Sequence, residues 1–323
     1  MKRKMILAVA SVVLLGVPRL IHAQSGVVSS TQNPLQIALL HWDVANQVTT
    51  QFSTGLSPAS AVFDGASIWV SNYNSFSVTR LRASDGATLG TYSMPNHPYA
   101  MAYDGANIWV TIPDMSSVGK IRASDGTLLA TYSAGAWPDG IAFDGANIWV
   151  ADANSNMVTK LRASDGFNLG TFPVGTYPRG VAFDGTNIWV ANHNGNTVTK
   201  LRASDGFNLG TFPVGNGAFG VAFDGTNIWA ASDSSNTVTK LRASDGATLG
   251  TYSVGAKPSV VVFDGANIWT ANQNSNSVTK LRARDGACVG TCTFAVGTTP
   301  DGMAFDGANI WVANWGSNNV SKL

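Results

Sequence analysis

A twelve-residue phrase recurs along this chain and constrains its fold more than any other feature. One copy reads VAFDGTNIWVAN, at residues 181–192. The spacing between copies is 40 residues five times and then 42. Their aromatic residues are Phe63, Tyr103, Phe143, Phe183, Phe223, Phe263 and Phe305. A period of about 40 residues is typical of repeat proteins in which each unit buries its apolar face against the next.

Each repeat contains four runs of β-forming residues separated by turn residues. In the copy at residues 177–215, the runs are GVAF, NIWVAN, TVTKLRA and FNLGTFPV. Asp-Gly follows the first and third runs and favours hairpins, because both residues tolerate positive φ. The pattern predicts an all-β fold, a seven-bladed β-propeller of four-stranded antiparallel blades. A β-solenoid would need shorter coils, and an open meander would leave long unpaired edges.

The two ends of the chain complement each other. The last repeat stops at NNVSKL, residues 318–323, and lacks its fourth run. The segment Ala38–Gly55 has the length and rhythm of that missing part. We therefore predict that the N-terminal segment pairs with the C-terminal blade and closes the ring, which removes an exposed sheet edge.

The first residues have the layout of a secretory signal peptide. Basic residues 2–4 precede an apolar run at 5–17, and Ala23 precedes the expected cleavage point. The apolar run is too short to span a bilayer comfortably, although an uncleaved anchor is the alternative. We expect a secreted or periplasmic protein with no membrane insertion after cleavage. The predicted organisation is a signal peptide at 1–23, a linker at 24–34 and the propeller at 35–323.

The net charge excludes one class of partner, and the two cysteines predict a local disulfide. Signal cleavage removes four of the 20 basic residues and none of the 19 acidic ones, which changes the formal charge from +1 to −3. Such a balance gives no general attraction to nucleic acid. Cys288 and Cys292 lie where the repeat gains two residues, and export favours a local disulfide over two half-buried thiols.

Two features repeat so faithfully that we interpret them as framework. A tryptophan occupies one position on the second run of every copy, and we expect it to pack between blades. The third run carries paired cations such as Lys200 and Arg202, whose stems can cover apolar surface while Asp205 compensates charge.

Three positions vary between copies, and the strand order places all three on one face of the ring. The first ring, just before the first strand of each blade, is Ala59, Tyr99, Asp139, Arg179, Phe219, Ser259 and Asp301. The second ring, two residues earlier, is Ser57, His97, Trp137, Tyr177, Gly217, Lys257 and Thr299. The third ring, between the second and third strands, is Tyr73, Pro113, Ala153, His193, Asp233, Gln273 and Trp315.

We predict a ligand site at this face, around the central channel. A concave site with aromatic walls and a few polar groups is the usual place for a ligand. The residues expected to supply contact area are Tyr99, Trp137, Tyr177, Phe219 and Trp315. The residues expected to orient a polar ligand are Asp139, Arg179, Lys257 and Asp301. The alternative is drift, because exposed loops accept almost any residue.

The sequence offers few catalytic or metal-binding groups. His193 with Asp233, or Asp139 with Asp301, are weak candidates for acid–base chemistry. Residues 152–156, DANSN, match only the start of a Ca²⁺-binding loop. No phosphate-binding loop, nucleophile elbow or HExxH motif is present. We expect no cofactor, with a divalent metal as the alternative.

The repeated phrases resemble those of known propellers. From about Leu35 to Leu323 they resemble bacterial YVTN/NHL-like propellers and are similar to the virginiamycin B lyase-like group. That group implies metal-assisted elimination that opens a cyclic peptide antibiotic, with His and Glu residues near the channel. This chain contains no Glu, and His193 is its one histidine in a loop between second and third strands. Other relatives imply exported or cell-surface binding proteins.

The favoured hypothesis is an exported, monomeric propeller that binds a ligand on its variable face. The partner expected is a small polar ligand, glycan, peptide or protein. The first alternative is a metal-dependent lyase or hydrolase of the virginiamycin B lyase-like type, although a non-enzyme is favoured. The second alternative is a structural envelope or matrix protein.

Overall fold

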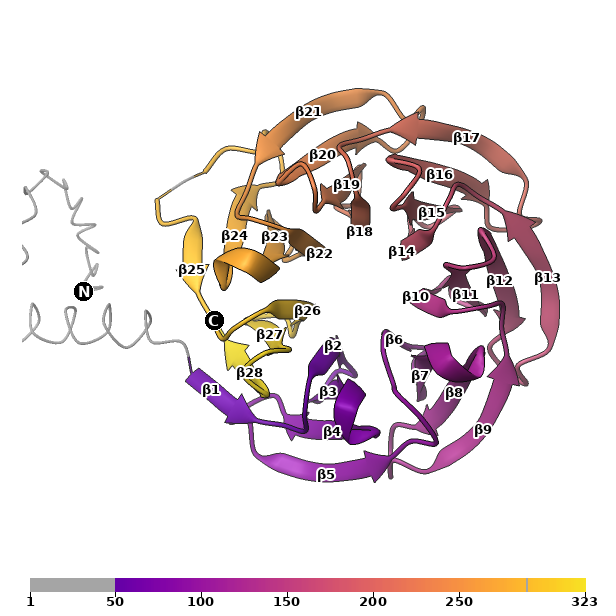
Figure 1. Ribbon diagram of the computed structural model, residues 1–323, viewed down its shortest axis with the longest axis vertical. Helices are drawn as coiled ribbons and strands as arrows, with labels where there is room; N and C mark the ends of the chain where they lie inside the picture. Colours follow the sequence, from indigo (N-terminus) through magenta and orange to yellow (C-terminus); the bar gives the residue numbers. More distant parts are fainter. Residues whose placement is uncertain (1–49, 289) are drawn as a thin grey trace, which may run out of the picture. The chain divides into compact units, whose positions relative to one another are not determined.

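The described part of the chain, residues 50–288 and 290–323 of a computed structural model, is a ring of seven four-stranded antiparallel sheets (Figure 1). In six sheets the strands follow chain order from the centre outward. The predicted seven-bladed β-propeller is confirmed. The predicted signal peptide, the linker and the propeller's start at residue 35 lie outside the described residues.

The strand bounds match the runs in the sequence. Blade 1 is β2 (Pro58–Phe63), β3 (Ser67–Asn72), β4 (Ser77–Arg82) and β5 (Thr88–Ser93). Blade 2 is β6 (Met101–Tyr103), β7 (Asn107–Ile112), β8 (Ser117–Arg122) and β9 (Leu128–Ser133). Blade 3 is β10 (Pro138–Phe143), β11 (Asn147–Asp152), β12 (Met157–Arg162) and β13 (Asn168–Pro173). Blade 4 is β14 (Pro178–Phe183), β15 (Asn187–Asn192), β16 (Thr197–Arg202) and β17 (Asn208–Pro213).

The remaining blades continue the pattern. Blade 5 is β18 (Ala218–Phe223), β19 (Asn227–Ser232), β20 (Thr237–Arg242) and β21 (Thr248–Ser253). Blade 6 is β22 (Pro258–Phe263), β23 (Asn267–Asn272), β24 (Ser277–Arg282) and β25 (Thr293–Ala295). Blade 7 is β26 (Pro300–Phe305), β27 (Ile310–Asn314), β28 (Asn319–Lys322) and β1 (Thr50–Ser53). Three 3₁₀ turns lie between second and third strands, namely η1 (Tyr73–Ser75), η2 (Pro113–Met115) and η3 (Gln273–Ser275).

The ring is closed by the N-terminal strand, as predicted. Strand β1 pairs antiparallel with β28, with Gln51 opposite Ser321 (Figure 1). The ring of Phe52 lies 5.4 Å from that of Trp311, centroid to centroid. Phe52 thus takes the place that an outer-strand Phe or Tyr has in the other blades. Chain ends far apart in sequence are held together by one blade.

The Asp-Gly pair of the repeated phrase forms a hydrogen-bonded turn in each blade. In blade 4, Oδ1 of Asp184 accepts the backbone N–H groups of Thr186 and Asn187 at 2.9 and 2.6 Å. Its Oδ2 accepts the indole N–H of Trp189 at 2.7 Å. All seven tryptophans donate in this way at 2.7–2.8 Å. A buried indole keeps its hydrogen bond while its ring faces apolar groups.

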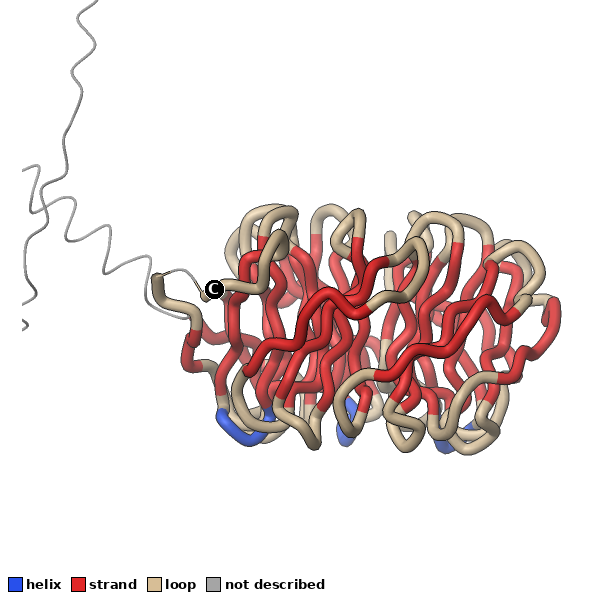
Figure 2. The backbone as a smooth tube through the Cα atoms, turned by 90° about the horizontal axis from the view of Figure 1, so that it is seen from above, coloured by secondary structure: helices blue, strands red, loops and turns tan. Residues whose placement is uncertain are grey.

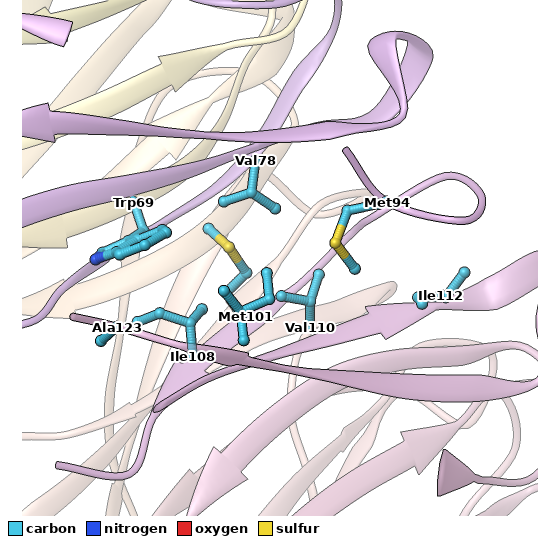
Figure 3. Packing of buried hydrophobic residues seen from close by; sticks show 9 residues of the cluster. Trp69, Val78, Met94, Met101, Ile108, Val110, Ile112 and Ala123 are labelled. Carbon is cyan, nitrogen blue, oxygen red and sulfur yellow. The ribbon is translucent and has the colours of Figure 1, made fainter. Parts of the chain in front are cut away.

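The tryptophans pack between blades, which confirms their framework role. Trp189 has no solvent exposure and belongs to one cluster with Ile228 and Leu241 of blade 5. Figure 3 shows the same arrangement for Trp69, which lies near Met101 and Ile108 of blade 2. Apolar burial of this kind is the main force that joins neighbouring blades.

Third-strand lysines of five blades add a polar link to the next blade. Nζ of Lys200 lies 5.1 Å from the ring centroid of Trp189 and donates to the carbonyl oxygen of Ala243 in blade 5 at 2.7 Å. Arg202 pairs with Asp205 within its own turn at 2.7 Å. The cations are therefore part of the framework, as predicted.

A disulfide joins Cys288 and Cys292 in the loop between β24 and β25, with Cα atoms 5.6 Å apart. Among residues 50–288 and 290–323, we find no helix with the length and apolar character needed to cross a membrane.

The turn glycines allow a direct test of the contact between blades. Gly206 has φ of 75°, and a Cβ added to it would overlap the ring of Phe172 from blade 3. We expect Gly206→Ala to lower the free energy of unfolding by about 1–3 kcal/mol more than Gly185→Ala, measured by urea denaturation. Gly185 is the matched control, because its φ is 94° and its Cβ would meet open space. Equal losses would show that backbone strain alone accounts for both effects.

Candidate functional site

The three variable rings lie on one face. The backbone N–H of His193, in the third ring, donates to the carbonyl of Tyr177, in the second ring, at 2.9 Å. In the same way, the backbone N–H of Gln273 donates to the carbonyl of Lys257 at 3.0 Å. The turns η1, η2 and η3, which begin in the third ring, all lie on one side of the propeller (Figure 2).

A cavity of about 240 Å³ occupies the centre of the ring and is lined by first-strand segments from all seven blades. Four of the nine predicted ligand residues line this cavity, namely Tyr99, Asp139, Phe219 and Asp301. The first ring therefore surrounds the channel, and these four side chains come from blades 2, 3, 5 and 7. The cavity is small enough to take one functional group of a ligand rather than a whole glycan or peptide.

Glycines next to the first ring set the width of the channel. A Cβ on Gly140 would overlap the carbonyl oxygen of Arg179 in the next blade, and one on Gly180 would meet the carbonyl of Phe219. Gly220 and Gly302 make similar approaches and also line the cavity. These glycines were not among the site residues predicted from the sequence. Their signal was a glycine inside an otherwise apolar strand, which often marks close approach of another backbone.

Asp139 and Arg179 form a buried ion pair at the channel. Nη1 of Arg179 lies 3.3 Å from Oδ2 of Asp139, and the two side chains are 20% and 5% exposed. The guanidinium also stacks on Phe219, 4.4 Å from the ring centroid, and on Tyr177 at 5.3 Å. Nε of Arg179 is buried without a hydrogen-bond partner among the described residues.

The pair is electrostatically asymmetric. Burial raises the pKa of Asp139, and the positive charges of Arg179 and His193 only partly oppose that rise. Burial alone would lower the pKa of Arg179, but the opposing influences of Asp139, Tyr99, Tyr177 and Asp301 together outweigh it and the net direction is upward. Arg179 is therefore cationic at any physiological pH, and its charge is the largest influence that favours the ionised form of Asp139.

Asp301 is a second buried carboxylate, and it has no cation bonded to it among the described residues. It is 8% exposed, and Oδ1 accepts Nε2 of Gln273 at 2.6 Å. Burial raises its pKa to about 6, with Asp139 adding to the rise and Gln273, Arg179 and Lys257 opposing it. The third-ring residue Gln273 was not among the predicted site residues. Gln273 acts at the site by donating to Asp301, which lies 28 residues away in sequence.

Tyr99 completes the polar lining. Burial raises its pKa well above the ordinary value, the charges of Asp301 and Asp139 add to the rise, and Arg179 opposes it. Tyr99 is therefore a neutral phenol at physiological pH. Groups from blades 2, 3, 4 and 7 thus influence one another across the channel.

The other five predicted ligand residues, Arg179 among them, do not line the cavity. Trp137 is half-buried and Lys257 is exposed in the second ring. Trp315 packs on Tyr73 with ring centroids 5.2 Å apart, and Tyr73 lies 6.2 Å from Tyr99. Tyr177 reaches the site only through its contact with Arg179. These residues surround the channel's mouth rather than its interior.

The second ring holds bulky residues in an unusual backbone conformation. Trp137, Tyr177 and Lys257 have φ of 58°, 56° and 56°, in the left-handed region where Gly217 lies in blade 5. The backbone N–H groups of Tyr177 and Lys257 each donate to an asparagine side chain of the preceding blade. For Tyr177 the acceptor is Oδ1 of Asn156, at 2.8 Å. Such conformations cost on the order of 1 kcal/mol and often mark functional positions.

His193 and Asp233, the weak catalytic candidates, do meet. Nε2 of His193 lies 3.1 Å from Oδ2 of Asp233 in the next blade. The hydrogen bond to Asp233 raises the pKa of His193, although burial opposes it. Burial would raise the pKa of Asp233, but the bonds to His193 and Ser234 lower it overall. Neither residue lines the cavity.

Asp152, the first residue of DANSN, is a structural residue. It has no solvent exposure, and it accepts the Thr159 hydroxyl at 2.6 Å and the Gly135 N–H at 2.9 Å. In the part of the chain that the structure describes, no three His, Cys, Asp or Glu residues cluster closely enough to hold a metal ion.

Comparison with known proteins gives structural similarity only. No protein-family model and no curated protein sequence matches this chain. Virginiamycin B lyase from Staphylococcus aureus is similar with a TM-score of 0.73 and 18% identity, over 85% of this chain and 98% of that one. The similarity establishes the fold alone.

Similar structures differ widely in function. Hydrazine synthase of Kuenenia stuttgartiensis has a TM-score of 0.73 and 19% identity, over 85% of this chain and 97% of the other. A chain of a mitotic checkpoint complex has a TM-score of 0.75 and 15% identity, over 86% and 95%. The same architecture thus occurs in enzymes and in assemblies, and function must be argued from the site.

Proposed function

We propose that this chain is an exported binding protein whose ligand enters the central channel from the face that carries the three variable rings. The framework residues repeat from blade to blade, whereas the first ring differs in size, charge and polarity at nearly every blade. A scaffold of near-identical blades can vary a single ring without disturbing its packing.

The observation that carries the proposal is the lining of the 240 Å³ cavity. Asp139 and Asp301 are 4% and 8% exposed, and burial of ionisable groups is costly unless other groups stabilise them. Perturbed carboxylates gathered in a concave site are characteristic of functional positions. The strained aromatic residues Trp137 and Tyr177 at the mouth add contact area to the same face.

A thermal-shift screen of the full chain against glycans, peptides and small polar metabolites tests the proposal. We expect at least one compound to raise the melting temperature, and Phe219→Ala to weaken its binding about tenfold or more. Phe207→Ala is the matched control, because Phe207 is 59% exposed on the outer side of blade 4. Hits that are insensitive to Phe219→Ala would place binding elsewhere and contradict the proposal.

A metal-dependent lyase or hydrolase is the second candidate. The contact of 3.1 Å between His193 and Asp233, beside the aromatic rings of Tyr177 and Phe219, favours it. Such an enzyme should lose turnover on a cyclic depsipeptide with EDTA and with His193→Ala while remaining folded. Turnover that survives both treatments, or an absence of turnover in the parent chain, rules against this candidate.

A further inference from the structure

Two carboxylates line the channel, and one guanidinium is paired with the first of them. Arg179 pairs with Asp139, so the carboxylate of Asp301 has no bonded cation among the described residues. Only its Oδ1 accepts a protein hydrogen bond, from the neutral amide of Gln273, and its Oδ2 accepts none in that part of the chain. A carboxylate that is 8% exposed and lines a cavity is stabilised by a cationic ligand group more than by any other.

We propose that the channel receives the ammonium group of a primary aliphatic amine, which pairs with Asp301. This inference rests on the proposed function and names the chemistry of its ligand. A primary ammonium is compact and has three donors, so it can bond more than one carboxylate oxygen at once. The apolar side chains of Val261 and Met303, which also line the cavity, suit the methylene groups next to the nitrogen.

The surroundings argue against an anionic ligand. Among the residues that the structure describes, Arg179 is the one mostly buried cation near the cavity, and it is already paired with Asp139. Its Nε is buried, and its guanidinium stacks on the ring of Phe219. An anion in the channel would approach Asp139 and Asp301 without gaining an unpaired cation.

Four molecules test the charge requirement by calorimetry on the full chain at pH 7.5. These are n-butylamine, 1-butanol, butyrate and lysine blocked at its α-amino and carboxyl groups. We expect n-butylamine to bind at least tenfold more tightly than 1-butanol or butyrate. If blocked lysine also binds, the natural ligand is a lysine side chain of a peptide. If n-butylamine binds and blocked lysine does not, the natural ligand is a free amine. Preferential binding of butyrate would overturn the inference.

Asp301→Asn locates the site. We expect this variant to weaken n-butylamine binding at least tenfold, because it removes the charge and keeps the shape. Asp152→Asn is the matched control, since Asp152 is a buried carboxylate outside the cavity whose place is taken by Asn192 in blade 4. Retained binding by Asp301→Asn contradicts the inference.

The pH dependence of amine binding to the unmodified chain provides a second test, separate from the variants. The charged or titratable groups that influence Asp301 are Asp139, Arg179 and Lys257, with Gln273 as its hydrogen-bond donor. Because the carboxylate ionises near pH 6, amine affinity should rise between pH 5 and pH 7.5. A pH-independent affinity argues against Asp301 as the partner. If no amine binds while other hits depend on Phe219, the inference fails and the proposed function stands.

Discussion

Replacing Arg179 with alanine is expected to lower the free energy of unfolding by about 2–4 kcal/mol at pH 7.5. The change leaves Asp139, which is 4% exposed, without the cation that lies 3.3 Å away. It also removes the guanidinium from between Phe219 and Tyr177. The estimate lies below the usual range for a buried pair, because the Arg179 side chain is one-fifth exposed to water. Urea denaturation measures the loss.

The loss at Arg179 should depend on pH in a defined direction. The pKa of Asp139 is already raised in the folded protein, and removal of Arg179 raises it further. A carboxyl with a raised folded pKa contributes its stability below the unfolded pKa and loses it as pH rises through the folded value. The variant should therefore lose less stability at pH 4 than at pH 7.5.

A second substitution separates charge from packing. Adding Asp139→Asn to Arg179→Ala removes the unpaired carboxylate, and we expect it to restore a large part of the lost stability at pH 7.5. The double variant is also the suitable background for binding experiments, because it separates ligand contact from folding. Equal losses at both pH values, with no rescue, would show that Arg179 acts by packing alone.

Replacing Trp189 with alanine is expected to have the largest effect on stability, a loss of about 3–5 kcal/mol. The indole has no solvent exposure and packs against Ile228 and Leu241 of the next blade. Its removal leaves a cavity between blades, and Oδ2 of Asp184 loses its 2.7 Å hydrogen bond. Chemical denaturation monitored by circular dichroism measures the change without relying on tryptophan fluorescence.

Trp315→Ala is the control for that experiment. Trp315 is half-buried in the third ring and contacts Tyr73 of blade 1 at the variable face, whereas Trp189 lies in the buried core between blades. We expect its loss to be less than half of that for Trp189. Comparable losses would contradict the distinction between framework tryptophans and those on the variable face.

Local patterns were sufficient to predict the blades and their strands. NIWVAN became β15 at the same bounds, and the Asp-Gly pairs became the hairpin turns. The missing fourth strand of the last repeat was correctly supplied from the N-terminal side, at Thr50–Ser53. These predictions succeed because turn chemistry and apolar alternation act within a few residues and are repeated seven times.

The candidate site was predictable only in outline. Comparing repeats located the first ring, and six of its seven residues line the cavity, all except Arg179. The pairing of Asp139 with Arg179 and the bond from Gln273 to Asp301 were not predicted. Each joins neighbouring blades, and nothing in the intervening sequence specifies which side chains will face each other. Trp137, Lys257 and Trp315 were expected at the ligand site but lie outside the cavity.

The sequence by itself therefore determined the number of blades, the strand bounds, the closure of the ring and the face on which variation gathers. Only the tertiary structure decided which varying residues line the channel and which of its charges are compensated. The reason is physical: hairpins form through contacts between near neighbours, whereas the burial and pairing of Asp139, Arg179 and Asp301 exist only once seven blades have closed around one axis.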